Sequence, residues 1–185
     1  MVKGVQIVGA HHDGTTRAYT SHWVTQVSFE EPIVMASISP KHDTYPLIVA
    51  SGAFTVSLLA ADQIAEGQYF SYPGHRFAYV ADEYLTTASE DHPDGPVDIV
   101  PGCIAWLRCT VLDVQDSVGG VPLDHRPVFA RVTETGDVGR LKEPPLLYSS
   151  RLGWRQAGGP AREPGVSIRD RLLERLARGE QSEPM

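Results

Sequence analysis

Residues 18–45 read AYTSHWVTQVSFEEPIVMASISPKHDTY, and this stretch carries the clearest fold signal in the chain. Its first half belongs to a run from Thr16 to Ser28 that is rich in Thr, Val, Tyr and Trp, which suit a pleated, half-buried strand. The run from Ile33 to Ser39 is apolar on both alternating faces, and prolines stand just outside its two ends. The stretch therefore predicts two strands, of which the second is central in its sheet.

Short strands are also predicted on either side of this stretch. The run Val5–Val8 ends at Gly9, and Asp13-Gly14 is a strong hairpin signal. Further strands are expected at residues 54–59, 102–115, 126–135 and 146–148. Short helices are expected at 43–52, where Pro46 lies in the first turn and Gly52 follows the end, and at 61–70. The turn-rich residues 86–102 are expected to form a long loop.

Six or more short strands with only short helices between them indicate an all-β barrel or sandwich, because parallel α/β sheets need crossover helices between most strands. The length of 185 residues favours a single domain. Beyond a linker at Gly158-Gly159-Pro160, the spacing of Ile168, Leu172 and Leu176 predicts a terminal helix with one apolar stripe. That helix would have to pack on the barrel or on a second subunit.

Composition excludes several classes of protein. A net charge of −7 argues against a general nucleic-acid binder, which needs a basic surface. We read no membrane-spanning run and no secretory signal in the sequence, so a cytoplasmic location is expected. Cys103 and Cys109 lie in one predicted strand about 20 Å apart, too far for a disulfide.

Local catalytic motifs do not explain the chain. It contains no G-x-G-x-x-G, P-loop, H-E-x-x-H, G-x-S-x-G or C-x-x-C motif. His11 and His12 would point to opposite faces of a strand and would not converge on one ion, so we expect no metal site. Any chemistry must come from residues that the fold brings together.

Several motifs occur in an order that resembles a known family. They are residues 18–45, residues 51–59, His75-Arg76-Phe77, residues 101–109, Asp124-His125 and residues 145–148. Together they make the chain similar to the flavin reductase-like family of FMN-binding split barrels, which includes flavin reductases, ferric reductases and flavoredoxins. The resemblance implies an antiparallel split β-barrel of about six strands over residues 1–155. Residues 156–185 would be a linker and a C-terminal helix.

The resemblance also implies a cofactor site, and the chemistry of the residues suits it. Ser37, Ser39, Lys41 and Thr44 lie where a strand runs into a predicted helix start, which favours a phosphate. Residues 23–26 could supply an apolar face and hydrogen bonds to a flavin ring. The full expected set is His22, Trp23, Val24, Thr25, Gln26, Ser28, Ser37, Ser39, Lys41, Thr44, Tyr45 and Arg76.

The catalytic candidate is His125, which matches the family's Gly-Asp-His motif and would position the nicotinamide donor. Leu123 stands where the family often has Gly. The resemblance implies hydride transfer from NADH or NADPH to FMN, with FAD as the alternative flavin, in a homodimer. The acceptor of the electrons would be a monooxygenase, ferric iron or another protein.

Two other interpretations stay open from the sequence. The first is an electron carrier of the flavoredoxin type that uses no pyridine nucleotide, which the departure at Leu123 favours. The second is a barrel of related shape that holds haem, a deazaflavin or pyridoxal phosphate.

Overall fold

A computed structural model describes residues 1–71, 84–93, 95–149, 151 and 153–156 of the chain. Arg76, the predicted linker at 158–160 and the predicted C-terminal helix lie outside these residues. Neither of the two helices in the described part is long and apolar enough to cross a membrane.

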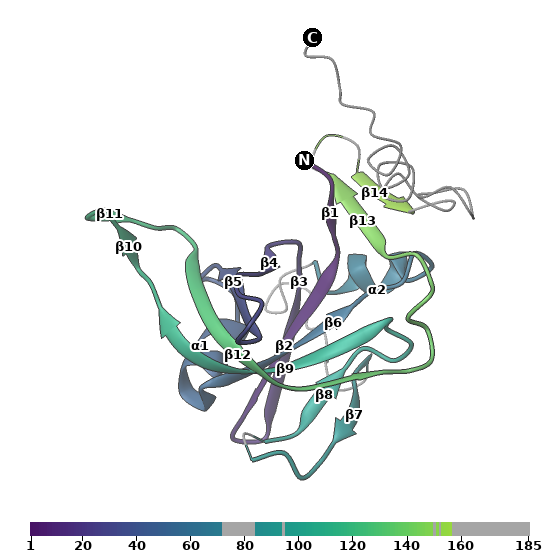
Figure 1. Ribbon diagram of the computed structural model, residues 1–185, viewed down its shortest axis with the longest axis horizontal. Helices are drawn as coiled ribbons and strands as arrows, with labels where there is room; N and C mark the ends of the chain where they lie inside the picture. Colours follow the sequence, from purple (N-terminus) through teal and green to yellow (C-terminus); the bar gives the residue numbers. More distant parts are fainter. Residues whose placement is uncertain (72–83, 94, 150, 152, 157–185) are drawn as a thin grey trace, which may run out of the picture.

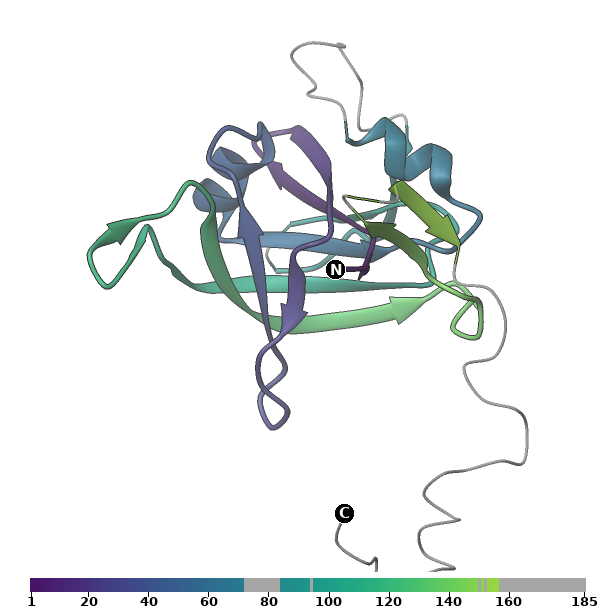
Figure 2. The ribbon, with the colours of Figure 1, turned by 90° about the horizontal axis from the view of Figure 1, so that it is seen from above.

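One curled antiparallel sheet of seven strands forms the centre of the molecule, in the order β3-β2-β6-β9-β12-β5-β4 (Figures 1 and 2). The all-β antiparallel prediction is confirmed, with seven strands in this sheet where about six were expected. The strands are β2 (Gln6–His12), β3 (Thr15–Ser21), β4 (Val24–Gln26), β5 (Ile33–Ile38), β6 (Ala53–Leu58), β9 (Ala105–Val114) and β12 (Arg126–Asp137).

Smaller elements surround this sheet. A three-stranded sheet has the order β1-β13-β14, and two hairpins, β7–β8 and β10–β11, extend the structure. These strands are β1 (Lys3–Gly4), β7 (Thr86–Ser89), β8 (Val97–Ile99), β10 (Ser117–Val118), β11 (Val121–Pro122), β13 (Leu146–Ser149) and β14 (Gly153–Gln156). The helices are α1 (Thr44–Ser51) and α2 (Ile64–Tyr69), close to the two predicted helices.

The core consists of two apolar clusters, because successive side chains of a strand point to opposite faces of its sheet. In β2, Ile7 packs with Phe70, Trp106 and other residues of one cluster. The adjacent Val8 packs with Ile48 of α1 and other residues of the second cluster. The two clusters thus cover opposite faces of β2. In β5, one strand from the edge of the sheet, buried and half-buried residues alternate, so only one of its faces is fully buried.

Two predicted strand boundaries are wrong, for local reasons. β2 does not stop at Gly9 but continues to His12. Gly9 is needed there because a Cβ atom would lie 2.8 Å from Thr55 Oγ1 on the neighbouring strand. The predicted strand from Thr16 to Ser28 is in fact β3 and β4, separated at His22-Trp23, where the chain passes from one edge of the curled sheet to the other.

The predicted long loop at 86–102 contains the β7–β8 hairpin. The Asp98 carboxylate holds this hairpin: it accepts hydrogen bonds from Thr87 Oγ1 at 2.9 Å and from Thr16 Oγ1 at 3.1 Å. The Asp98 carboxylate therefore stabilises a hairpin in this turn-rich segment, which is not an irregular loop.

Both cysteines are free and buried, so the prediction that they do not bridge is confirmed. The strand that was expected to hold them both begins only at Ala105, which leaves Cys103 before β9. Burial raises the pKa of the Cys109 thiol to about 12, and that thiol stays protonated at neutral pH.

Candidate active site

The connection between β5 and α1, residues 39–43, forms the first part of the site; we call it the β5–α1 loop. His42 N–H donates to the Ser39 carbonyl, and Lys41 N–H approaches Ser39 Oγ at 3.4 Å, so the loop is a compact turn. Lys41 is exposed, and Ser39 is half-buried. The loop brings both side chains to the start of α1.

Thr44, the first residue of α1, has a buried hydroxyl that lacks a partner. The residue is 1% exposed, and Thr44 Oγ1 has no hydrogen bond within the described part of the chain. Asp43 at the N-cap does not use its side chain to cap the helix, and the first turn of α1 contains no acidic residue. A buried unpaired hydroxyl is costly, so this helix start suits an added acceptor such as a phosphate oxygen.

A second part of the site is a hollow of about 460 Å³ between the N-terminal strand and β4–β5, which we call the N-terminal hollow. Pairing of β4 with β5 sets Thr25 opposite Met35, and Ser37 N–H donates to the Trp23 carbonyl at 3.0 Å. Five of the predicted residues therefore meet here. The lining residues are Met1, Lys3, Gly4, Gln6, His22, Trp23, Val24, Thr25, Met35 and Ser37.

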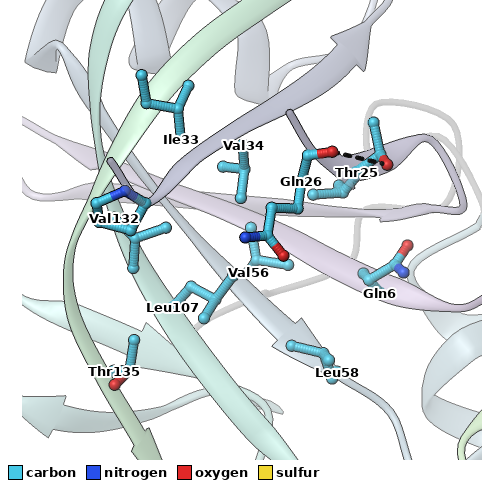
Figure 3. A pocket seen from close by; sticks show the side chains of 12 residues that line it. Gln6, Thr25, Gln26, Ile33, Val34, Val56, Leu58, Leu107, Val132 and Thr135 are labelled. Atoms are coloured by element: carbon cyan, nitrogen blue, oxygen red, sulfur yellow. Dashed lines mark hydrogen bonds between the residues drawn. The ribbon is translucent and has the colours of Figure 1, made fainter. Parts of the chain in front are cut away.

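An apolar hollow of about 320 Å³ lies next to this one and shares Gln6, Val24 and Thr25 with it (Figure 3). Figure 3 shows Val34, Val56, Leu58, Leu107 and Val132 around it. The lining residues are Gln6, Val24, Thr25, Gln26, Pro32, Ile33, Val34, Val56, Leu58, Leu107, Val132 and Thr135.

Two predicted residues, Gln26 and Ser28, belong to the β4–β5 hairpin beside this apolar hollow. Gln26 extends toward the hollow in Figure 3, and its Nε2 donates to the Ser28 carbonyl at 2.8 Å. Neither residue lines the N-terminal hollow. The Gln26 amide thus stabilises the hairpin, and the role expected for both residues at the cofactor stays a prediction.

His125 lies immediately before β12, where Arg126 pairs with Ile38 at the end of β5. Its ring centroid is 4.7 Å from that of Trp23, which places it beside the N-terminal hollow, and its charge acts on His42 of the β5–α1 loop. Asp124 Oδ1 is 3.3 Å from His125 Nδ1, and hydrogen bonding to His125, followed by its charge, lowers the pKa of Asp124. The predicted catalytic residue therefore adjoins the predicted cofactor residues.

The departure at Leu123 causes no backbone strain. Asp13, with φ of 48°, is the one non-glycine residue with positive φ in the described ranges, so Leu123 does not need the freedom of glycine. Leu123 N–H donates to the Asp116 carbonyl at 2.9 Å, and its own carbonyl accepts from the Arg126 guanidinium. The turn that carries His125 is thus fixed by its own hydrogen bonds.

Two further histidines surround the site. Burial, followed by the charge of Lys3, lowers the pKa of His22, whose ring centroid is 5.0 Å from that of Tyr148. Burial, followed by the charge of His125, lowers the pKa of His42 against the opposing effect of Asp43. His42 stacks on Tyr19 at 4.3 Å between ring centroids. Both imidazoles are consequently held neutral at neutral pH.

An aromatic hollow of about 260 Å³ lies on the other side of His22. Its lining residues are Val5, Thr20, His22, His42, Phe70, Ser71, Tyr148 and Trp154. Tyr45, another predicted residue, does not line any of these three hollows and packs against the second core cluster. In the described ranges no three His, Cys, Asp or Glu side chains cluster so that they could hold a metal ion.

Sequence reasoning missed Lys3, Gly4, Gln6 and Met35, which line the N-terminal hollow. Met35 stands inside the stretch that opened the sequence analysis, opposite Thr25, and its place on the outward face of β5 could have revealed it. Lys3 and Gln6 carry no local motif. They reach the site only through pairing of β1 with β13 and of β2 with its neighbours.

A family comparison now decides the relationship. The model of the flavin reductase like domain matches residues 1–152. The chain belongs to the flavin reductase-like domain family. Within this family, its curled antiparallel half-barrel agrees with a solved structure, the NADH:FAD oxidoreductase SgcE6 of Streptomyces globisporus. That structure superposes with a TM-score of 0.70 at 20% identity and covers 86% of this chain and 88% of the other.

Relatives with named activities are similar over most of this flavin reductase-like chain. The reductase component of 4-hydroxyphenylacetate 3-monooxygenase from Thermus thermophilus is 32% identical over 85% of this chain and 91% of its own length. The reductase component of a 4-nitrophenol monooxygenase from Rhodococcus opacus is 32% identical over 71% of this chain, which spans 64% of that relative. An NADH:riboflavin 5′-phosphate oxidoreductase from Streptomyces pristinaespiralis is 28% identical over 75% of this chain and 72% of its own length.

Proposed function

We propose that this chain is a flavin reductase that transfers a hydride from NADH or NADPH to FMN. The observation that carries the proposal is the buried, unpartnered Thr44 hydroxyl at the start of α1, one loop away from a hollow of about 460 Å³. The site thus offers an anion position and a ring position in adjacent elements. The family match and the named relatives support the same activity.

The residues of the β5–α1 loop would hold the phosphate. Ser39 Oγ and Thr44 Oγ1 can donate hydrogen bonds to the phosphate, and Lys41 supplies a positive charge. This single anion position at one helix start favours FMN over FAD in our proposal.

The ring would lie in the N-terminal hollow against Trp23, Val24 and Ser37. When bound, the flavin supplies the redox chemistry by accepting two electrons from reduced nicotinamide. The protein would orient the flavin and nicotinamide rings and shield them. Trp23 offers a flat apolar face, Thr25 and Ser37 offer polar contacts, and His125 at 4.7 Å from Trp23 borders the place where a nicotinamide could stack.

The electrons would pass to a monooxygenase component, the setting in which two of the named relatives work. We also propose a homodimer. Phe29 is 95% exposed and Val27 is 47% exposed at the hairpin that borders the apolar hollow, an apolar surface of the kind that subunits cover. Light scattering of the purified protein would report twice the chain mass if this holds and the single chain mass if it does not.

Two more proposals complete this account. Residues 1–155 would be the flavin-binding domain, and residues 156–185 a linker and helix that pack on the barrel or on the partner subunit. The two free, buried thiols suit a reducing compartment, which in this proposal is the cytoplasm.

The activity is tested by mixing the full chain and FMN with NADH, then with NADPH, and following absorbance at 340 nm. We expect flavin-dependent consumption of at least one donor. His125→Ala should raise KM for the donor by about tenfold, while Kd for FMN changes by less than about threefold.

The matched control is His12→Ala, since His12 lies at the β2–β3 turn and lines none of the three hollows. This variant should leave both the KM for the donor and the Kd for FMN unchanged. Flavin binding without consumption of either donor would contradict the reductase and leave an electron carrier.

A further inference from the structure

Lys3 is close to the chain start but is held in place by strand pairing. It lies in β1 opposite Tyr148 of β13, and the next residues continue the ladder, with Val5 N–H donating to the Leu146 carbonyl at 2.9 Å. Lys3 is half-buried, whereas Met1 before it is 94% exposed. The backbone of Lys3 is therefore part of the sheet, and its side chain has a defined place.

The ammonium group of Lys3 lies over an aromatic ring of the site. Its Nζ is 5.1 Å from the centroid of Trp23, within the range of a cation–π contact. In the part of the chain that the structure describes, Lys3 forms no ion pair with a carboxylate. Among the described contacts of Lys3, the one that favours its charge is therefore the cation–π contact with Trp23.

Lys3 is also the one permanently charged side chain among the ten residues that line the N-terminal hollow. No acidic side chain lines that hollow. His22, the other basic residue there, has its pKa lowered by burial and by Lys3 and is neutral at neutral pH. The side chains of the hollow consequently present one positive charge beside an aromatic face, an arrangement that favours a flat ligand carrying negative charge.

We propose that Lys3 contacts the flavin ring and stabilises the negative charge that the ring carries in its reduced form. This inference rests on the proposed function, because it requires the ring in the N-terminal hollow. A fixed cation in a partly dehydrated site stabilises charge that appears during the reaction more than it stabilises the neutral starting state. Lys3 therefore binds reduced flavin more tightly than oxidised flavin and raises the reduction potential of the bound flavin.

The test compares Lys3→Met, Lys3→Arg and the control Lys41→Met. Dissociation constants are measured for FMN and for riboflavin, each oxidised and, under anaerobic conditions, reduced. Riboflavin has the ring but lacks the phosphate, so it separates ring contacts from phosphate contacts. Thermal melting of each variant verifies that it is folded.

We expect Lys3→Met to weaken reduced FMN and reduced riboflavin by about tenfold, the size of a lost contact to a charged group, and both oxidised forms by less than about threefold. A tenfold difference between the two redox states equals a potential lower by about 30 mV for a two-electron couple. Lys3→Arg should restore most of the effect. Lys41→Met should weaken the binding of FMN in both redox states and leave the binding of riboflavin unchanged.

Equal weakening of oxidised and reduced flavin would overturn the proposal, because Lys3 would then not distinguish the charge of the reduced ring. A loss confined to FMN would also overturn it, by placing Lys3 against the phosphate. Unchanged constants in folded Lys3→Met would overturn it as well. If the unmodified protein binds neither FMN nor riboflavin, the proposed function itself fails, and this outcome is distinct from a failure of Lys3 alone.

Discussion

The β5–α1 loop and the N-terminal hollow adjoin each other but are built in different ways. Residues 39–44 follow one another in sequence, and the turn at Ser39 and the start of α1 bring their polar groups together. The hollow is assembled from β1, β2, β4 and β5, and its ammonium group and its aromatic ring come from residues 3 and 23. A local segment can specify an anion site, whereas a site for a ring needs the whole sheet.

This contrast divides the work of flavin binding. The loop would recognise the phosphate, which riboflavin lacks, and the hollow would recognise the ring, which FMN and riboflavin share. Substitutions in the two regions should therefore affect the two ligands differently.

Trp23→Ala should give the largest effect. Removing an aromatic face that covers the ring costs about 1.5–3 kcal/mol, so the affinities for FMN and for riboflavin should both fall by about 10- to 100-fold. Fluorescence titration measures both. Trp23 is 40% exposed, so the variant should stay folded. Trp23→Phe is the control and should keep most of the affinity; unchanged binding by Trp23→Ala would remove the hollow from the flavin site.

Thr44→Val should give an intermediate effect that depends on the ligand. Loss of one hydrogen bond to a charged group should weaken FMN by about tenfold and leave riboflavin unchanged. Because Thr44 Oγ1 is buried without a partner, the variant without ligand should be more stable to urea by about 1 kcal/mol. Thr44→Ser, which keeps the hydroxyl, should bind FMN normally. A loss of riboflavin binding in Thr44→Val would mean that Thr44 at the start of α1 contacts the ring.

The smallest effect is expected at His42, as a change in how the stability of the protein depends on pH. Its folded pKa lies below the ordinary value of 6.5, so the unfolded chain binds the proton more tightly, and stability should be lost as pH falls below 6.5. Urea unfolding at pH 7.5 and pH 5.5 should show a smaller loss for His42→Gln than for the unmodified chain. Bound FMN, whose phosphate favours the imidazolium, should reduce the loss, and riboflavin should not. Equal losses in His42→Gln and the unmodified chain would contradict this role.

Much of the fold could be predicted because its signals are local. The apolar run from Ile33 to Ser39 became β5, and Pro46 and Gly52 marked α1 correctly. The β7–β8 hairpin could not be predicted, because Asp98 holds it through Thr16, a residue 82 positions away. The break at His22-Trp23 was also missed, since only the closure of the sheet requires the chain to change edges there.

The site shows the same difference between residues with a local sequence signal and residues brought in by strand pairing. Ser39, Lys41 and Thr44 were proposed from a polar cluster at a helix start, and His125 from a short motif, and their roles at the flavin stay predictions. The cofactor contacts expected for Gln26 and Ser28 stay predictions, and the structure shows that Gln26 Nε2 donates to the Ser28 carbonyl within the hairpin. Lys3 and Gln6 were missed because strand pairing, which no short motif records, brings them to the hollow.

Titration of the full chain with FMN, followed by flavin fluorescence, tests the central claim most directly. The account predicts saturable binding of one FMN per chain, with fluorescence quenched by stacking against Trp23. Absence of saturable binding for FMN, FAD and riboflavin alike would contradict it.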